Sequence, residues 1–269
     1  MLRTFIRDNF AFRTYEVSLY DPSVMEVYKP EEILKHTLHR SFPMPNQDWV
    51  VLSEWKDVLM LHWKVGASTV KRILPKELSI DTFEGGAWVT ICVASVDNFT
   101  NRFFTLIKQG FSFDQVIMQT YVIHNGKPGL YIFNQELEKS FTKNLYKKIF
   151  KLKQGETEIV RESTGEEHKF FAKNDFSGFK LGLKYRFGTD IPKTQIESWL
   201  TNRFKYFHEK QGNLYEYSVH HIEWKFKEVY LEKFKSKFMY GGLELITQPD
   251  FIHYSPGIQK LFWPKFLIK

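Results

Sequence analysis

The sequence predicts a mainly β protein with some α structure, built as an antiparallel barrel or folded sheet with a few short helices. Apolar or alternating segments of strand length recur along the chain, and helical patterns separate only a few of them. Aromatic residues make up 17% of the 269 residues, with Phe the most frequent, and such residues suit the faces of strands. A doubly wound α/β fold would require regular alternation of strands and helices, which the sequence lacks.

We expect residues 1–48 to form an extension that precedes a main domain of residues 49–269. In the extension, Lys29–Leu34 is predicted to be a short helix, because Pro30 suits its first turn and the two glutamates suit its N-terminal end. The segment Ser41–Asn46 contains two prolines, which prevent a helix from continuing, and is predicted to be a linker.

The main domain is expected to consist chiefly of strands, which turn residues separate. The strands are predicted at Asp57–Trp63, Trp88–Val96, Gln115–His124, Leu130–Phe133, Glu156–Arg161, His168–Ala172, Phe179–Phe187, Phe204–Phe207, Leu214–His221, Trp224–Phe234 and Phe251–Trp263. Asn125-Gly126 between two of these strands indicates a hairpin. Helices are predicted at Ala67–Leu74, Ser140–Leu152 and Ile191–Leu200, the last of them opened by Pro192.

Composition favours a cytoplasmic protein. The single cysteine, Cys92, allows no intramolecular disulfide and is expected to be a buried thiol. The N-terminal residues lack the apolar core of a signal peptide, and no apolar run reaches the roughly 20 residues that span a bilayer. We therefore expect no membrane association, while exposed strand edges would allow a homo-oligomer.

The net charge of +7 permits contact with nucleic acid but does not establish it. Most lysines are scattered among glutamates, so we expect no nucleic-acid partner. The exception is the predicted helix Ser140–Leu152, where Lys139, Lys143, Lys147 and Lys151 recur every four residues. A solvated face is the favoured interpretation, and a basic surface module that binds nucleic acid or anionic lipid is an alternative.

Several segments in fixed order resemble one known family. They are Leu61–Val65, Ile73–Val89, Thr120–Val122, Asn125–Tyr131, Leu200–Phe204, His220–Trp224 and His253–Gly257. Together they resemble the YqjF-like (DUF2071) family of the acetoacetate decarboxylase superfamily, from about Trp49 to Pro264. The resemblance implies an acetoacetate decarboxylase-like barrel and, in the wider superfamily, a lysine that forms a Schiff base with a keto substrate. A second lysine beside it keeps the first one uncharged, and therefore nucleophilic.

The superfamily's pair of lysines has no counterpart in this chain. By alignment, the pair falls on Gln154 and Gly155, neither of which can form an imine. Lys153 is one residue away and Lys151 is close, so both are weak catalytic candidates. A superfamily carboxylate falls near Gln115, and a superfamily arginine falls near Lys56. These differences argue against decarboxylation by the usual mechanism.

The favoured function is the binding of a small organic ligand in an apolar pocket inside the barrel, without a cofactor. An alternative is a Schiff-base lyase, similar to a decarboxylase, that uses Lys153 or Lys151 on a keto acid. Polar residues at matching family positions or among apolar strand residues are the candidate ligand contacts: His62, Tyr121, Gln115, Arg203, His220 and His253. His221 and Glu223 share a strand face, but a metal site would need further ligands, for which His62 and His253 are candidates. Structural histidines are the favoured interpretation, so no metal site is expected.

Overall fold

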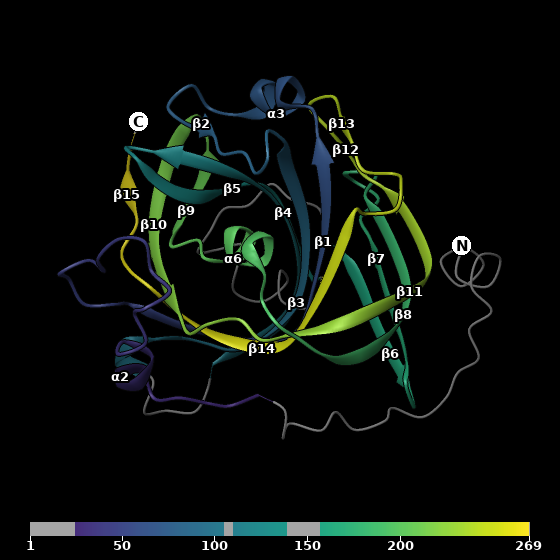
Figure 1. Ribbon diagram of the computed structural model, residues 1–269, viewed down its shortest axis with the longest axis horizontal. Coiled ribbons are helices and arrows are strands. Elements are labelled where there is room, and N and C mark those ends of the chain that lie inside the picture. Colours follow the sequence, from purple (N-terminus) through teal and green to yellow (C-terminus); the bar gives the residue numbers. More distant parts are fainter. Residues whose placement is uncertain (1–24, 105–109, 139–156, 269) are drawn as a thin grey trace.

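A computed structural model describes residues 25–104, 110–138 and 157–268, and it is mainly β (Figure 1). The strands are β1 (Val51–Val65), β2 (Ser79–Ile80), β3 (Ala87–Asn101), β4 (Phe111–His124), β5 (Lys127–Leu137), β6 (Glu158–Thr164), β7 (Glu167–Lys173), β8 (Lys180–Ile191), β9 (Lys205–Lys210), β10 (Asn213–His221), β11 (Phe226–Lys237), β12 (Met239–Tyr240), β13 (Leu243–Glu244), β14 (Phe251–Phe262) and β15 (Phe266–Leu267). The helices are α2 (Pro30–Ile33), α3 (Ala67–Ile73) and α6 (Gln195–Thr201), with one 3₁₀ turn, η2 (Arg102–Phe104). The predicted fold class is confirmed.

All strands except β12 and β13 belong to one 13-stranded sheet, part of which closes on itself. The closed part runs β10-β9-β5-β4-β3-β1-β14 and returns to β10, because β10 pairs with both β9 and β14. Within this ring only β5 and β9 are parallel. Strands β11, β8, β7 and β6 continue the sheet from β14 as a wing, and α6 lies inside the ring (Figure 1).

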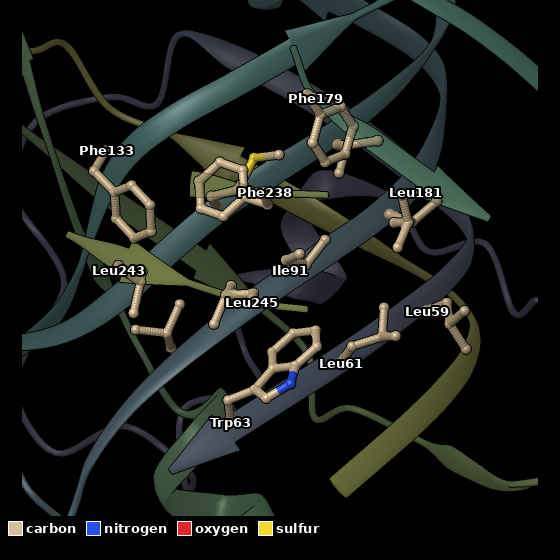
Figure 2. Close-up of a cluster of buried hydrophobic side chains, with 14 of the residues drawn as sticks. Leu59, Leu61, Trp63, Ile91, Phe133, Phe179, Leu181, Phe238, Leu243 and Leu245 are labelled. Carbon is tan, nitrogen blue, oxygen red and sulfur yellow. The ribbon is translucent and has the colours of Figure 1, made fainter. Parts of the chain in front are cut away.

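Alternation along β1 separates two apolar cores. Leu59, Leu61 and Trp63 point to one side, where they pack with Leu181 of β8 and with Phe179, which precedes that strand (Figure 2). The side chains between them point to the inside of the ring, because successive side chains of a strand face opposite sides. The inner core is built from residues such as Trp55, Met60, Cys92, Ile117 and Trp224. Position 62, which continues this inner row, carries a histidine.

A break in β1 changes which side chains face inward. The pairing of β1 with β3 shifts between Lys56 and Leu59, and Asp57 has a positive φ of 47°. As a result, Trp55 and Val58 both belong to the inner core, although they are three residues apart. A bulge of this kind adds a residue to one strand and reverses its alternation.

The structure corrects the predicted helix at Ile191–Leu200. Strand β8 continues to Ile191, and α6 begins at Gln195. The true start is a capping box: Thr194 is the N-cap residue, and its backbone N–H donates to the Glu197 carboxylate over 2.8 Å. Pro192 therefore lies in the connection and not in the first turn.

Residues 25–48, the described part of the predicted extension, pack against the barrel. Ile33 of α2 is fully buried in a core cluster with Leu261 and Trp263. Behind it, the Arg40 guanidinium donates to the Val219 carbonyl over 3.0 Å. The predicted helix Ser140–Leu152 with its lysine face lies outside the described residues.

No helix in the described ranges is long and apolar enough to cross a bilayer.

Candidate functional site

A chain of hydrogen bonds crosses the inner face of the ring, from β4 through β3 to β1. His62 lies opposite Thr90 in the antiparallel register. The Thr90 hydroxyl is 2.7 Å from the Tyr121 hydroxyl and 2.8 Å from Nδ1 of His62. All three side chains have no exposed surface. The ring of Trp199, from α6, lies over Tyr121 with 4.6 Å between centroids.

The hydroxyl protons of this chain determine the state of His62. The hydroxyl of Tyr121 is buried and must donate, and its partners are Thr90 Oγ1 at 2.7 Å and His62 Nδ1 at 3.5 Å. The hydroxyl of Thr90 is equally buried, and each order of donation that gives both hydroxyl protons an acceptor makes Nδ1 of His62 an acceptor. Burial, together with the nearby His253, lowers the pKa of His62 well below its usual value, so the ring is neutral. The proton of neutral His62 therefore resides on Nε2, which has no partner in the described structure.

A second imidazole lies beside the first. The ring of His253, on β14, is 5.1 Å from that of His62 between centroids, in an edge-on arrangement. Nε2 of His253 is 3.1 Å from Oε1 of Glu197, a residue of α6. A carboxylate accepts, so Nε2 of His253 carries the proton and donates it. Its Nδ1 is buried without a partner among the described residues.

Trp88 and Arg203 add two further donors, which lie beside Phe251 and beside the rings of Trp199 and Tyr121, respectively. The indole of Trp88 contacts the ring of Phe251, which stacks near His253. One arm of the Arg203 guanidinium donates to Asp81, and its plane lies 4.4 Å from the centroid of Trp199. Nε1 of Trp88 and Nη2 of Arg203 are buried, and no partner of either is found in the described parts of the chain.

The inside of the ring also contains a buried lysine. Nζ of Lys260 donates to the Tyr206 hydroxyl over 3.1 Å and lies 3.2 Å from the ring centroid of Trp55. Trp224 covers it on another side, with 5.0 Å to the centroid. Across the described residues, no carboxylate forms an ion pair with this amine. Burial lowers the pKa of Lys260 to about 7.

The structure brings four of the predicted ligand contacts to this interior and gives the other two different surroundings. The four are His62, Tyr121, Arg203 and His253. Gln115 is also buried, but its Oε1 accepts from Gln135 over 2.8 Å.

His220 points to the opposite side of β10. Its two nitrogens contact Arg40 at 3.0 Å and the Ile33 carbonyl at 2.9 Å, so its ring helps to hold the N-terminal segment. Lys151 and Lys153, the weak catalytic candidates, lie outside the described residues.

Four residues of this interior escaped sequence reasoning: Thr90, Trp88, Glu197 and Lys260. Glu197 is hidden by its second role as a helix-capping residue. Lys260 carries the one available signal, since it is a lysine in the otherwise uncharged segment Phe251–Trp263. His221 is buried, whereas Glu223 is exposed and pairs with Lys193. Among the residues that the structure describes, no three side chains are arranged to hold a metal ion.

The ring with its internal helix is the acetoacetate decarboxylase-like fold, as two solved structures show. An acetoacetate decarboxylase from Legionella pneumophila has a TM-score of 0.55 at 11% identity, with 88% of this chain and 95% of that chain covered. MppR, an enduracididine biosynthesis enzyme complexed with pyruvate, has a TM-score of 0.55 at 9% identity, covering 85% and 93%. At these identities the similarity concerns the fold alone.

The chain belongs to the DUF2071 family, described as an uncharacterized conserved protein, whose model matches residues 53–259. It is also similar to the uncharacterized protein YqjF of Bacillus subtilis, at 25% identity over 232 residues, which cover 84% of this chain and 95% of that protein. The predicted family is therefore confirmed.

Proposed function

We propose that this protein binds a small organic molecule on the inner face of the ring, between α6 and strands β1, β3 and β14. The observation that carries the proposal is a group of buried nitrogens that lack hydrogen-bond partners in the described structure. They are His62 Nε2, Trp88 Nε1, Arg203 Nη2 and His253 Nδ1. Their surroundings are aromatic, as expected of a site where a few polar groups orient a mainly apolar ligand.

Energetics support this interpretation. A buried polar group without a partner costs about 1–3 kcal/mol, and native proteins contain few of them. A ligand that accepts from Trp88 and Arg203 would remove that cost for both groups. Since these atoms have almost no contact with solvent, binding requires neighbouring side chains or α6 to move. We therefore expect binding to be slow relative to diffusion and to raise the unfolding temperature.

Pyruvate is the first probe, because MppR, a protein of similar fold, is complexed with it. Titration calorimetry and thermal unfolding would measure binding to the wild-type protein, and a panel of small carboxylic acids and aldehydes would follow. If no member of the panel binds or raises the unfolding temperature, the proposal is wrong.

Two tryptophans give a matched pair of variants. Trp88→Phe removes an N–H that has no partner in the free protein, so it should weaken ligand binding by about tenfold, the effect of one hydrogen bond. Trp63→Phe removes an N–H that donates to the Thr247 carbonyl over 3.0 Å on the other side of the sheet. This control should destabilise the free protein but leave ligand affinity unchanged. Equal ligand affinities in the two variants would contradict the assignment of the site.

The buried amine of Lys260 favours a second candidate function, a Schiff-base enzyme. Imine formation requires an uncharged amine, and a lysine buried without a carboxylate partner provides one near neutral pH. Lys260 would then take the role that the sequence suggested for Lys153 or Lys151. The amine would attack a carbonyl carbon and release water, leaving a carbon–nitrogen double bond.

Borohydride reduction would test this candidate. Treatment of the protein with pyruvate and borohydride should add the reduced substrate's mass to the peptide that contains Lys260. Lys260→Met should abolish that adduct. An adduct on another lysine would move the role to that residue, and the absence of any adduct with keto acids and aldehydes would exclude Schiff-base chemistry.

A further inference from the structure

The two interior imidazoles have complementary free nitrogens. His62 accepts at Nδ1 from the Thr90–Tyr121 chain, so its free Nε2 carries a proton. His253 donates from Nε2 to Glu197, so its free Nδ1 carries a lone pair. One ring can therefore donate a hydrogen bond, and the other can accept a proton, with 5.1 Å between their centroids. The two nitrogens do not bond to each other, which leaves both for a third group.

The environment of His253 is that of a general base. Burial alone would raise the pKa of the Glu197 carboxyl, but hydrogen bonds led by that of the Thr194 hydroxyl lower it, so the group is ionised. Burial lowers the pKa of His253, and the Glu197 carboxylate acts in the opposite direction. The imidazole is thus neutral at pH 7, and the carboxylate stabilises the imidazolium that forms when Nδ1 takes up a proton. Titratable groups facing His253 are Glu197 from α6 and His62 from β1.

We propose that Glu197 and His253 form a carboxylate–imidazole dyad that removes a proton from the carbon beside the carbonyl group of a bound molecule. Nε2–H of His62 donates a hydrogen bond to the carbonyl oxygen. The inference rests on the proposed function and names its substrate class: a small ketone, aldehyde or keto acid with an acidic hydrogen on the adjacent carbon.

The proposed step needs no cofactor and consumes no water. The electrons of the carbon–hydrogen bond form a carbon–carbon double bond, and those of the carbonyl bond move to the oxygen. The proton moves to Nδ1 of His253, so the site then holds an enolate, an imidazolium and the Glu197 carboxylate. Return of the proton to carbon regenerates the keto form. Because the neutral His62 keeps its proton, it stabilises the oxygen as a hydrogen-bond donor and not as an acid.

Dry surroundings favour this reaction over hydrolysis. Phe226 and Phe251 lie beside the ring of His253, at 5.2 and 6.5 Å between centroids. Water at Nδ1 would be the substrate of a hydrolytic base, but that atom is buried among aromatic side chains. The ligand itself is then the nearest source of a proton.

Exchange of the methyl hydrogens of pyruvate in deuterated buffer, followed by proton NMR, would test the dyad. Hydroxyacetone serves as a neutral second probe. The protein should speed the exchange above the buffer rate, and His253→Gln should lower the protein-catalysed rate by about 100-fold or more. His168→Gln, on wing strand β7, is the matched control and should leave the rate unchanged.

The pH dependence of the exchange rate tests the role of Glu197 as a positioning residue. Exchange should rise with pH as His253 loses its proton. Glu197→Gln should lower the rate and move this rise to lower pH, because the carboxylate that stabilises the imidazolium is gone. A purely structural role would reduce the amount of folded protein without moving the pH profile.

Binding of the same probes, measured by calorimetry, separates the two proposals. If either probe binds but neither exchanges, the dyad is refuted while ligand binding stands. If neither binds and neither exchanges, ligand binding by this substrate class and the dyad both fail. Borohydride distinguishes the dyad from an imine, which would also promote exchange. Loss of exchange after reduction in the presence of pyruvate would assign the reaction to an amine and overturn the dyad.

Discussion

Replacement of Lys260 by methionine should stabilise the protein at neutral pH. Burial lowers the pKa of Lys260 from 10.5 to about 7, which corresponds to roughly 5 kcal/mol at about 1.4 kcal/mol per pH unit. Most of this free energy is lost at pH 7, because Lys260 is fully protonated in the unfolded chain but only about half protonated in the fold. Methionine has a similar length and avoids that loss. The variant forfeits the hydrogen bond to Tyr206, worth about 1 kcal/mol, so we expect a net gain of about 4 kcal/mol.

The pH dependence gives this prediction a second signature. Between pH 7 and 10.5 the unfolded chain binds more protons at Lys260 than the folded protein does, so the wild-type free energy of unfolding should rise with pH. Lys260→Met should lack this contribution. The advantage of the variant should therefore be largest at pH 7 or below and should shrink as the pH approaches 10.5.

Urea unfolding of both proteins at pH 7 and pH 9.5 would measure these differences, and other titrating groups cancel in the comparison. A variant less stable than wild type at pH 7 would show that the rings of Trp55 and Trp224 hold a charged ammonium. That result would refute the reasoning that makes Lys260 a neutral amine.

Three further changes test other parts of the structure. Acidification from pH 6.5 to 5 should lower the free energy of unfolding by about 2 kcal/mol through His220 alone, because burial lowers its pKa to about 4 and the unfolded chain binds the extra proton. Urea unfolding of the wild type and of His220→Asn at the two pH values would measure this contribution, and equal pH dependences of the two proteins would contradict it. Gly129→Ala should lower the free energy of unfolding by about 1–3 kcal/mol and weaken the β5–β9 pairing, because an added Cβ would lie 2.5 Å from the Lys205 carbonyl oxygen. Unchanged amide hydrogen exchange in β9 would contradict this prediction. Glu136→Ala should lower the free energy of unfolding by about 3 kcal/mol, because this buried carboxylate accepts hydrogen bonds from several side chains, including the Thr157 hydroxyl at 2.6 Å. A variant with the same unfolding temperature as the wild type would refute that role.

The sequence by itself determined the long strands, the fold class and the family, whereas the two-residue strands β2, β12, β13 and β15 were not predicted. Each predicted strand that lies in the described residues is present, because alternation of apolar side chains is a local property that the pleated backbone imposes. The hairpin at Asn125-Gly126 is likewise local: both residues have a positive φ, of 50° and 72°, which Asn and Gly adopt most readily. His62 and Tyr121 could be assigned to the interior for the same reason, as polar residues within buried strands.

Only the tertiary structure decided which polar groups meet. The Glu197–His253 contact joins residues 56 positions apart, and nothing in the local pattern of either segment indicates the other. Strict alternation from His253 would place Lys260 on the outside of β14. Strand β14 pairs with β1 without a register shift, so the reversal of faces at Asp57 of β1 extends to β14, and both His253 and Lys260 point inward. Closure of the ring through β10 then surrounds the lysine with aromatic rings and turns His220 toward the N-terminal segment. The sequence shows which side chains of a strand share a face. Whether that face points into the ring or away from it depends on bulges and on long-range strand pairing, which local residues do not encode.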